Sequence, residues 1–135
     1  LMDDVLIYKA QTIERCIKRV QEEYIGFEDE INTNFTKQDA IILNIERACQ
    51  ACIDIGNHFV KTHKLGSPQS SKDVFQILFS NKIIENELNK KLQAMVGFRN
   101  IAVHDYSNLN LEILHAIIKN ELDKLLDFSK IILLK

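Results

Sequence analysis

Apolar residues recur at intervals of three and four along most of the chain, the spacing that puts them on one face of an α-helix. The first such stretch covers residues 3–25. A second begins with Thr-Lys-Gln-Asp, which predicts Thr36 as the N-cap of a long helix. Its apolar positions from Ile41 to Val60 cover more than one face, so we expect this helix at the centre of the molecule.

The second half of the chain continues the pattern after a loop at residues 64–72, which holds the only proline. A short helix is expected at DVFQILFSN, a longer one over residues 83–97, and a last one over residues 111–132 with Asn108 or Asn110 as its cap. The pattern predicts an all-α fold, an antiparallel up-and-down four-helix bundle with one additional short helix. We expect a single domain over residues 1–135.

Composition supports this fold and narrows the function. One proline and four glycines among 135 residues are too few for the frequent turns of a β-sandwich. The net charge of −2 does not attract nucleic acid to the protein as a whole, so any phosphate contact needs a local patch. No apolar run is long enough to span a bilayer, and the first ten residues lack the pattern of a signal peptide, so we expect no membrane and a cytoplasmic location.

The three cysteines are Cys16, Cys49 and Cys52. An odd number without an export signal indicates reduced thiols. The Cys49–Cys52 pair has the C-x-x-C spacing of redox sites, but it lies inside a helical pattern and not at a strand-to-helix turn. Free cysteine packs as a small hydrophobic residue, so core positions are expected.

Most familiar catalytic motifs are missing from the sequence. His58 and His63 are five residues apart, about 140° around a helix, and do not share a face as a zinc pair would. His115 lies among leucines and isoleucines. There is no phosphate-binding glycine loop, no G-x-S-x-G elbow and no acidic cluster for two metal ions. We therefore expect neither a metal nor a cofactor.

The segment GFRNIAVHDY, residues 97–106, carries the remaining candidate chemistry. Histidine exchanges a proton near neutral pH, and a guanidinium grips phosphate oxygens. Cleavage of RNA by its own 2′-hydroxyl needs little more than Arg99 and His104 provide. On a continuous helix Arg99 and Tyr106 share a face and His104 lies about 140° away. Spacing alone also allows a plain helix end, with Arg99 paired to a carboxylate, His104 as a cap and Tyr106 packed by its ring.

The motif and its surroundings resemble a known family. Arg99-Asn100-x-x-x-His104-x-Tyr106 is similar to the R-x4-H-x-Y motif of HEPN domains of the HepT toxin type. Residues 44–60, NIERACQACIDIGNHFV, resemble the second helix of that family. SSKDVFQILFSNKII and AMVGFRNIAVHDY resemble its short third helix and the end of its fourth.

The resemblance implies a toxin of a type VII HepT/MntA toxin–antitoxin system. Such toxins are metal-independent endoribonucleases that act as homodimers on RNA, with the motif lining a cleft between subunits. Arg99 and His104 would be the catalytic pair, and Asn100 and Arg47 would support them or position RNA. The partner, an MntA-type nucleotidyltransferase, would transfer AMP from ATP onto Tyr106 and block the cleft with charge and bulk.

Two other functions remain open at this stage. A non-catalytic module could present substrate or scaffold to a nucleotidyltransferase, and a structural dimerisation bundle would have no activity. RNA binding by a mildly acidic chain would need cations beside the cleft, for which Lys82, Lys90 and Lys91 are the candidates. Phe98 and Val103 are expected in the core.

Overall fold

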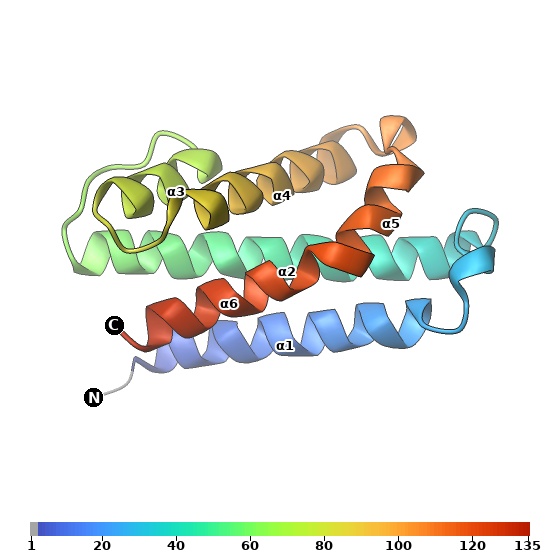
Figure 1. Cartoon of the computed structure of the whole chain (residues 1–135), viewed down its shortest axis with the longest axis horizontal. Coiled ribbons are helices and arrows are strands. Elements are labelled where there is room, and N and C mark those ends of the chain that lie inside the picture. The colour runs from blue at the N-terminus through green and yellow to red at the C-terminus, as the bar shows by residue number, and fades with distance from the viewer. Residues whose placement is uncertain (1–2) are drawn as a thin grey trace.

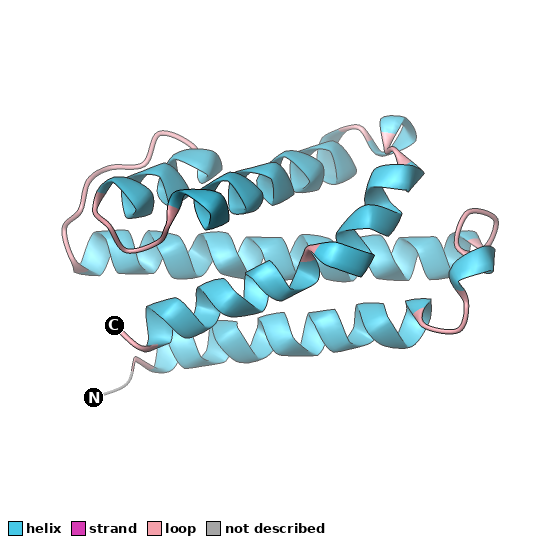
Figure 2. Ribbon diagram, in the orientation of Figure 1, coloured by secondary structure: helices cyan, strands magenta, loops and turns pink. Residues whose placement is uncertain are grey.

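The structure is a computed structural model that describes residues 3–135, and every regular element in that range is helical (Figure 2). Six α-helices are present: α1 (Asp4–Tyr24), α2 (Phe35–Thr62), α3 (Ser71–Ser80), α4 (Asn86–His104), α5 (Leu111–Asn120) and α6 (Leu122–Leu133). Two single 3₁₀ turns lie between them, η1 (Glu28–Glu30) and η2 (Tyr106–Asn108). The predicted all-α fold is confirmed.

The helices form an up-and-down bundle. In Figure 1, α1, α2, α4 and the α5–α6 segment alternate in direction, and both ends of the described chain lie at the same end of the molecule. Helix α2 packs against α1, α3, α4 and α6, which is the central position that its wide apolar surface predicts. The short helix α3 packs on α4 and α2.

The core is built around α2. Cys16, Cys49 and Cys52 are free and buried in it, and burial raises the pKa of the Cys49 thiol to about 12. The core positions predicted for the cysteines are confirmed, and thiols held in the protonated form are unsuited to redox chemistry. Gly56 allows α3 to come close to α2, because a Cβ atom at that position would lie 2.5 Å from Cγ1 of Val74.

Helix α2 begins earlier than the sequence pattern predicts. Asn34, not Thr36, is the N-cap, and its side-chain oxygen accepts a hydrogen bond from the Lys37 amide at 3.1 Å. Asparagine is at least as good an N-cap as threonine, so the helix gains two residues and Thr36 lies in its first turn. The prediction of Thr36 as the cap is wrong.

The single last helix expected over residues 111–132 is two helices. The break falls at Glu121, whose carboxylate accepts a hydrogen bond from Nζ of Lys91 on α4 at 2.9 Å. Asn110 caps α5 as expected, with its side chain accepting from two backbone amides. The bend lets α6 pack along α1 and α2 while His115 of α5 reaches Tyr24 at the end of α1. Periodicity alone does not show this break, because apolar spacing continues through it.

Helix α4 continues seven residues beyond the predicted end and stops at His104. Phe98 is buried as expected, whereas Val103 is 44% exposed. The prediction of Val103 as a core residue is wrong, because it lies five positions from Phe98, about 140° around the helix, while Ala102 occupies the inward position.

Candidate active site along helices α2 and α4

The last two turns of α4 position the motif residues. Asn100 and His104 are four residues apart on an unbroken helix and therefore share a face. Arg99 lies about 140° from His104 around the axis. The helix ends at Asp105, whose backbone amide still donates to the Ile101 carbonyl and whose φ of −150° leaves the helical region. The chain then turns into η2, which carries Tyr106.

Arg99 is held by neutral oxygens. Its Nη1 donates to Oδ1 of Asn100 at 3.1 Å, and its Nη2 donates to Oε1 of Gln50 on α2 at 2.7 Å. Its Nε is buried without a hydrogen-bond partner. Arg99 forms no ion pair with any residue of the described range, so the alternative in which it pairs with a carboxylate is wrong in this structure.

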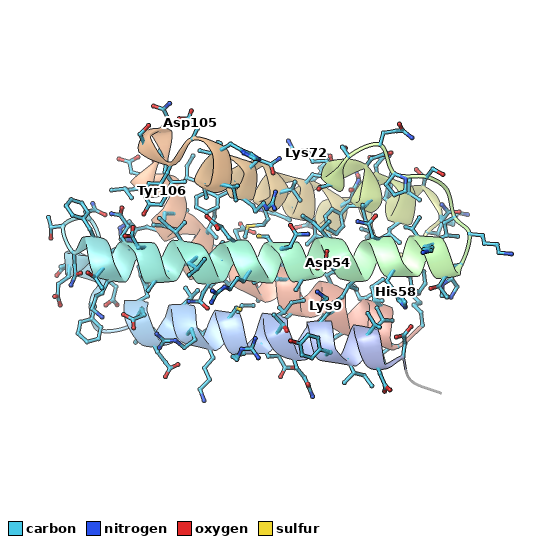
Figure 3. All side chains as sticks on the ribbon, turned by 180° about the vertical axis from the view of Figure 1, so that it is seen from behind. Lys9, Asp54, His58, Lys72, Asp105 and Tyr106 are labelled. Carbon is cyan, nitrogen blue, oxygen red and sulfur yellow. The ribbon has the colours of Figure 1, made fainter. Side chains whose placement is uncertain are left out.

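A stripe of side chains along α2 faces this end of α4. It follows helical spacing, and we call it the α2 stripe; its members are Asp39, Leu43, Glu46, Arg47, Gln50 and Asp54. None of them is buried. Figure 3 shows this side of the molecule, with α2 in front, Asp54 on its C-terminal half, and Tyr106 beside its N-terminal half.

Tyr106 is attached to the α2 stripe. Its hydroxyl donates a hydrogen bond to Oδ1 of Asp39. Burial of the ring, together with this hydrogen bond and the negative charges of Asp39 and Glu46, raises the pKa of the Tyr106 hydroxyl well above its usual value of 10. The phenol is therefore neutral at cellular pH, and with 41% of its surface exposed it stays within reach of a partner.

On α2, Glu46 and Arg47 lie between Asp39, which contacts Tyr106, and Gln50, which contacts Arg99. Burial raises the pKa of the Glu46 carboxyl, and the positive charges of Arg99 and Arg47 oppose that shift. Arg47 is exposed and makes no hydrogen bond or ion pair with the described residues. The structure thus leaves one cation of the stripe available to an anionic ligand.

His104 is exposed, and its side chain makes no hydrogen bond within residues 3–135. Its imidazole is not engaged in capping α4, because the cap position is Asp105. A solvent-accessible imidazole at the end of a rigid helix can exchange protons with a bound ligand.

One of the lysines expected beside the site, Lys91, has another partner. Lys91 is bound to Glu121, eight residues or about 12 Å along α4 from Arg99. Lys72, at the start of α3, lies over the motif helix instead, with Nζ 3.5 Å from the position that a Cβ atom of Gly97 would occupy. Gly97 precedes His104 by seven residues and shares its face. Figure 3 shows Lys72 on the same long side of the bundle as Asp105.

The remaining histidines have structural partners. His58 bonds to the carboxylate of Asp3, which caps α1, and this contact lowers the pKa of Asp3. His115 bonds through its two ring nitrogens to the Tyr24 hydroxyl at 2.7 Å and to Oδ1 of Asn32 at 2.9 Å. Residues 3–135 contain no group of three or more potential metal ligands, and no helix there is long and apolar enough to cross a membrane.

An antiparallel fold of six α-helices in the described residues, with Arg99, Asn100 and His104 at the end of α4, defines a HEPN-type helical domain. The family model described as "Ribonuclease HepT-like" matches residues 13–132. The chain therefore belongs to the ribonuclease HepT-like family, and the predicted resemblance and the prediction of a ribonuclease are confirmed at this level.

Similar proteins agree with this assignment over almost the whole chain. An mRNA nuclease HepT of Shewanella oneidensis is 47% identical over 131 residues, which are 97% of this chain and 98% of that protein. A solved tri-AMPylated Shewanella oneidensis HEPN toxin in complex with an MNT antitoxin has a TM-score of 0.94 and 45% identity, covering 99% of this chain and 100% of that one. A toxin–antitoxin structure with AMP-PNP has a TM-score of 0.93 and 46% identity, covering 97% and 99%.

Four residues near the motif were not singled out from the sequence: Asp39, Gln50, Asp54 and Lys72. Asp39 ends the Thr-Lys-Gln-Asp segment, and in the structure its carboxylate accepts a hydrogen bond from the Tyr106 hydroxyl. The helical spacing that puts Asp39, Gln50 and Asp54 on one face of a central helix was a visible signal. Their contacts with α4 could not be deduced from it.

Proposed function

We propose that this protein is the toxin of a HepT/MntA-type toxin–antitoxin system, a homodimeric endoribonuclease of the cytoplasm that cleaves RNA without a metal ion. The observation that carries the proposal is the state of Arg99. Its guanidinium is held in place by two amide oxygens and keeps its charge unpaired, and an exposed histidine follows five residues later on the same helix. Such an arrangement suits a ligand that brings both a phosphate and a proton to be moved.

In the proposed reaction the RNA supplies its own nucleophile. His104 takes the proton of a 2′-hydroxyl, the 2′-oxygen bonds to the adjacent phosphorus, and the bond from phosphorus to the 5′-oxygen breaks, with a proton delivered to that leaving oxygen. Arg99 stabilises the negative charge that gathers on the phosphoryl oxygens. Asn100 accepts from Arg99 and shares a face with His104, so it positions the pair.

A homodimer would supply what one chain lacks. Each chain has a single motif histidine, whereas the reaction needs a base and an acid. Exposed apolar side chains occur near the motif on both helices: Leu43 on α2, and Ile101 and Val103 on α4, each between 44% and 45% exposed. A second copy packed on these residues would bring two motifs to one cleft.

The proposed RNA contacts outside the motif are Arg47 and Lys72. Both are exposed cations without ion pairs in the described range. They lie on either side of the α4 motif, one on the α2 stripe and one across Gly97. The proposed substrate is messenger RNA, because the relative that is 47% identical to this chain is named an mRNA nuclease.

Inactivation would occur at Tyr106 by transfer of AMP from ATP, catalysed by an MntA-type nucleotidyltransferase. Support comes from the similar HEPN toxin that is tri-AMPylated in complex with its MNT antitoxin. The Tyr106 hydroxyl is neutral, partly exposed and fixed against Asp39. Phosphates attached there would place negative charge near the Arg99 end of α4 and repel RNA.

The test is cleavage of a fluorophore-labelled single-stranded RNA of mixed sequence in the presence of EDTA. Arg99→Ala and His104→Ala should each abolish cleavage and relieve growth arrest, with unchanged helical circular dichroism. Arg15→Ala, at an exposed position of α1, is the matched control and should cleave normally. Wild-type rates in either motif variant would refute the catalytic assignment. A wild-type protein with no cleavage that still forms a stable complex with the nucleotidyltransferase would favour the non-catalytic partner module instead.

A further inference from the structure

A chain of hydrogen bonds connects the motif arginine on α4 through α2 to a lysine on α1. Nζ of Lys9 on α1 bonds to Oδ2 of Asp54 at 2.9 Å. Oδ1 of Asp54 accepts from Nε2 of Gln50 at 2.9 Å. Oε1 of Gln50 then accepts from Nη2 of Arg99 at 2.7 Å. Figure 3 shows Lys9 and Asp54 where α1 and α2 lie side by side.

We propose that Gln50 and Asp54 are positioning residues for the nuclease reaction: they fix the Arg99 guanidinium for a phosphate of the RNA while leaving its positive charge unneutralised. The proposal rests on the proposed function. It concerns residues outside the R-x4-H-x-Y motif, and it assigns each a separate task.

Asp54 sets the orientation of the Gln50 amide. The two ends of a glutamine amide differ in chemistry, since the oxygen accepts and the nitrogen donates. Because the carboxylate of Asp54 can only accept, it takes the NH2 end, and the oxygen is left facing α4. With the opposite orientation an NH2 group would face a guanidinium, and both are donors. The i, i+4 spacing of Gln50 and Asp54 on α2 makes this contact local and stable.

Gln50 holds Arg99 without cancelling its charge. A carboxylate in its place would form a charge-assisted pair with the guanidinium and compete with the substrate phosphate. The nearest acid in the chain of contacts, Asp54, is separated from Arg99 by the neutral amide, and its own charge is matched by Lys9. The half-buried Glu46 also makes no ion pair with Arg99. The arrangement keeps one positive charge for an anion.

The decisive variant is Gln50→Glu, which changes one NH2 group to an oxygen and leaves the size of the side chain the same. It should lower the rate of cleavage of the labelled single-stranded RNA by ~10²-fold, the usual effect of losing one preorganised electrostatic contact. The thermal midpoint should change little, because the new carboxylate–guanidinium pair offsets the lost hydrogen bond to Asp54 and the repulsion between the two carboxylates. A purely structural role for Gln50 would not separate activity from stability in this way.

Binding provides a second measurement. The salt dependence of affinity for the non-cleavable 2′-deoxy analogue of the same oligonucleotide counts the phosphates that protein cations neutralise. In Gln50→Glu the new carboxylate neutralises Arg99. The slope of log K against log salt should therefore fall by about 0.7, the value for one phosphate contact with a single strand. Gln11→Glu, at an exposed position of α1 outside the chain of contacts, adds the same charge as a matched control and should change neither rate nor slope.

Asp54 is tested by a pair of variants. Asp54→Leu removes the acceptor for the Gln50 amide and should slow cleavage about tenfold through misplacement of Arg99. Asp54→Asn retains an oxygen for that amide and should restore most of the rate. Equal rates in Gln50→Glu and wild type, or equal losses in Asp54→Leu and Asp54→Asn, would overturn the inference. If instead Arg99→Ala cleaves like wild type, the proposed function fails first, so the two failures are distinguishable.

Discussion

The hydroxyl of Tyr106 donates a hydrogen bond to the carboxylate of Asp39, which lies 67 residues earlier in the chain. This contact attaches the η2 turn after α4 to the N-terminal half of α2. The proposed acceptor of AMP is thus fixed at one end of the α2 stripe, while Gln50 holds Arg99 in the middle of the same stripe. One exposed face of α2 therefore aligns both the proposed chemistry and its proposed regulation.

Tyr106 should ionise at higher pH than a free tyrosine. Burial and the Asp39 contact raise its pKa, so the protonated phenol is the form that folding favours. By linkage, this contribution to stability is complete below pH 10, the unfolded value, and is lost as the pH rises beyond it. In a Tyr8→Phe/Tyr24→Phe background the tyrosinate absorbance reports Tyr106 alone. Asp39→Asn should move the titration to lower pH, and an unchanged titration would contradict the contact.

AMP attachment should require the Tyr106 oxygen. Incubation of the toxin with its MntA-type partner and ATP is expected to add mass in steps of one AMP. Tyr106→Phe keeps the ring but removes the acceptor atom, so the increments should disappear from intact-protein mass spectra. Tyr8→Phe, at an exposed tyrosine on α1, is the control and should be modified normally. Increments that persist in Tyr106→Phe would assign the modification to another residue.

Lys72 should contribute to RNA binding and not to the chemical step. Its ammonium group lies across Gly97 on the face of α4 that carries Asn100 and His104. Lys72→Ala should weaken affinity for single-stranded RNA, reduce the salt slope by about 0.7, and leave the rate at saturating RNA unchanged. Lys18→Ala, an exposed lysine of α1, serves as the control. A slope equal to that of wild type would remove Lys72 from the binding surface.

Gly56→Ala should destabilise the fold. The new methyl group would lie 2.5 Å from Cγ1 of Val74, so α3 must move away from α2. Overpacking of this kind costs about 1–3 kcal/mol, measured as a lower midpoint in urea unfolding. Gly97→Ala is the matched control, because its nearest neighbour is the flexible end of Lys72 at 3.5 Å. It should be neutral or stabilising by up to ~1 kcal/mol, since alanine favours the helix.

Adding Val74→Ala to Gly56→Ala provides an internal check. The second substitution removes the atoms that the new methyl group meets, so the double variant should lose less stability than the sum of the two single variants. Strict additivity would show that the close approach of α2 and α3 is not what requires glycine at position 56.

The sequence predicted the type and order of the main helices except for the break at Glu121, and it also predicted the buried cysteines and the residues of the motif. Helical periodicity is a local property of the chain, so it can be read residue by residue. The same local character explains the errors. Asn34 and Thr36 are both good caps, and Val103 continues an apolar pattern even though it faces outward.

The partners of the motif residues were decided by the tertiary structure alone. Arg99 and Gln50 are 49 residues apart, and Tyr106 and Asp39 are 67 apart. The break at Glu121 likewise accompanies a contact with Lys91, 30 residues away. Such contacts depend on how the helices pack and rotate against one another, which the pattern along each separate helix does not encode. The sequence by itself thus determined which residues can take part in the proposed chemistry. The packing of the helices determined which neutral and charged side chains bind and orient those residues.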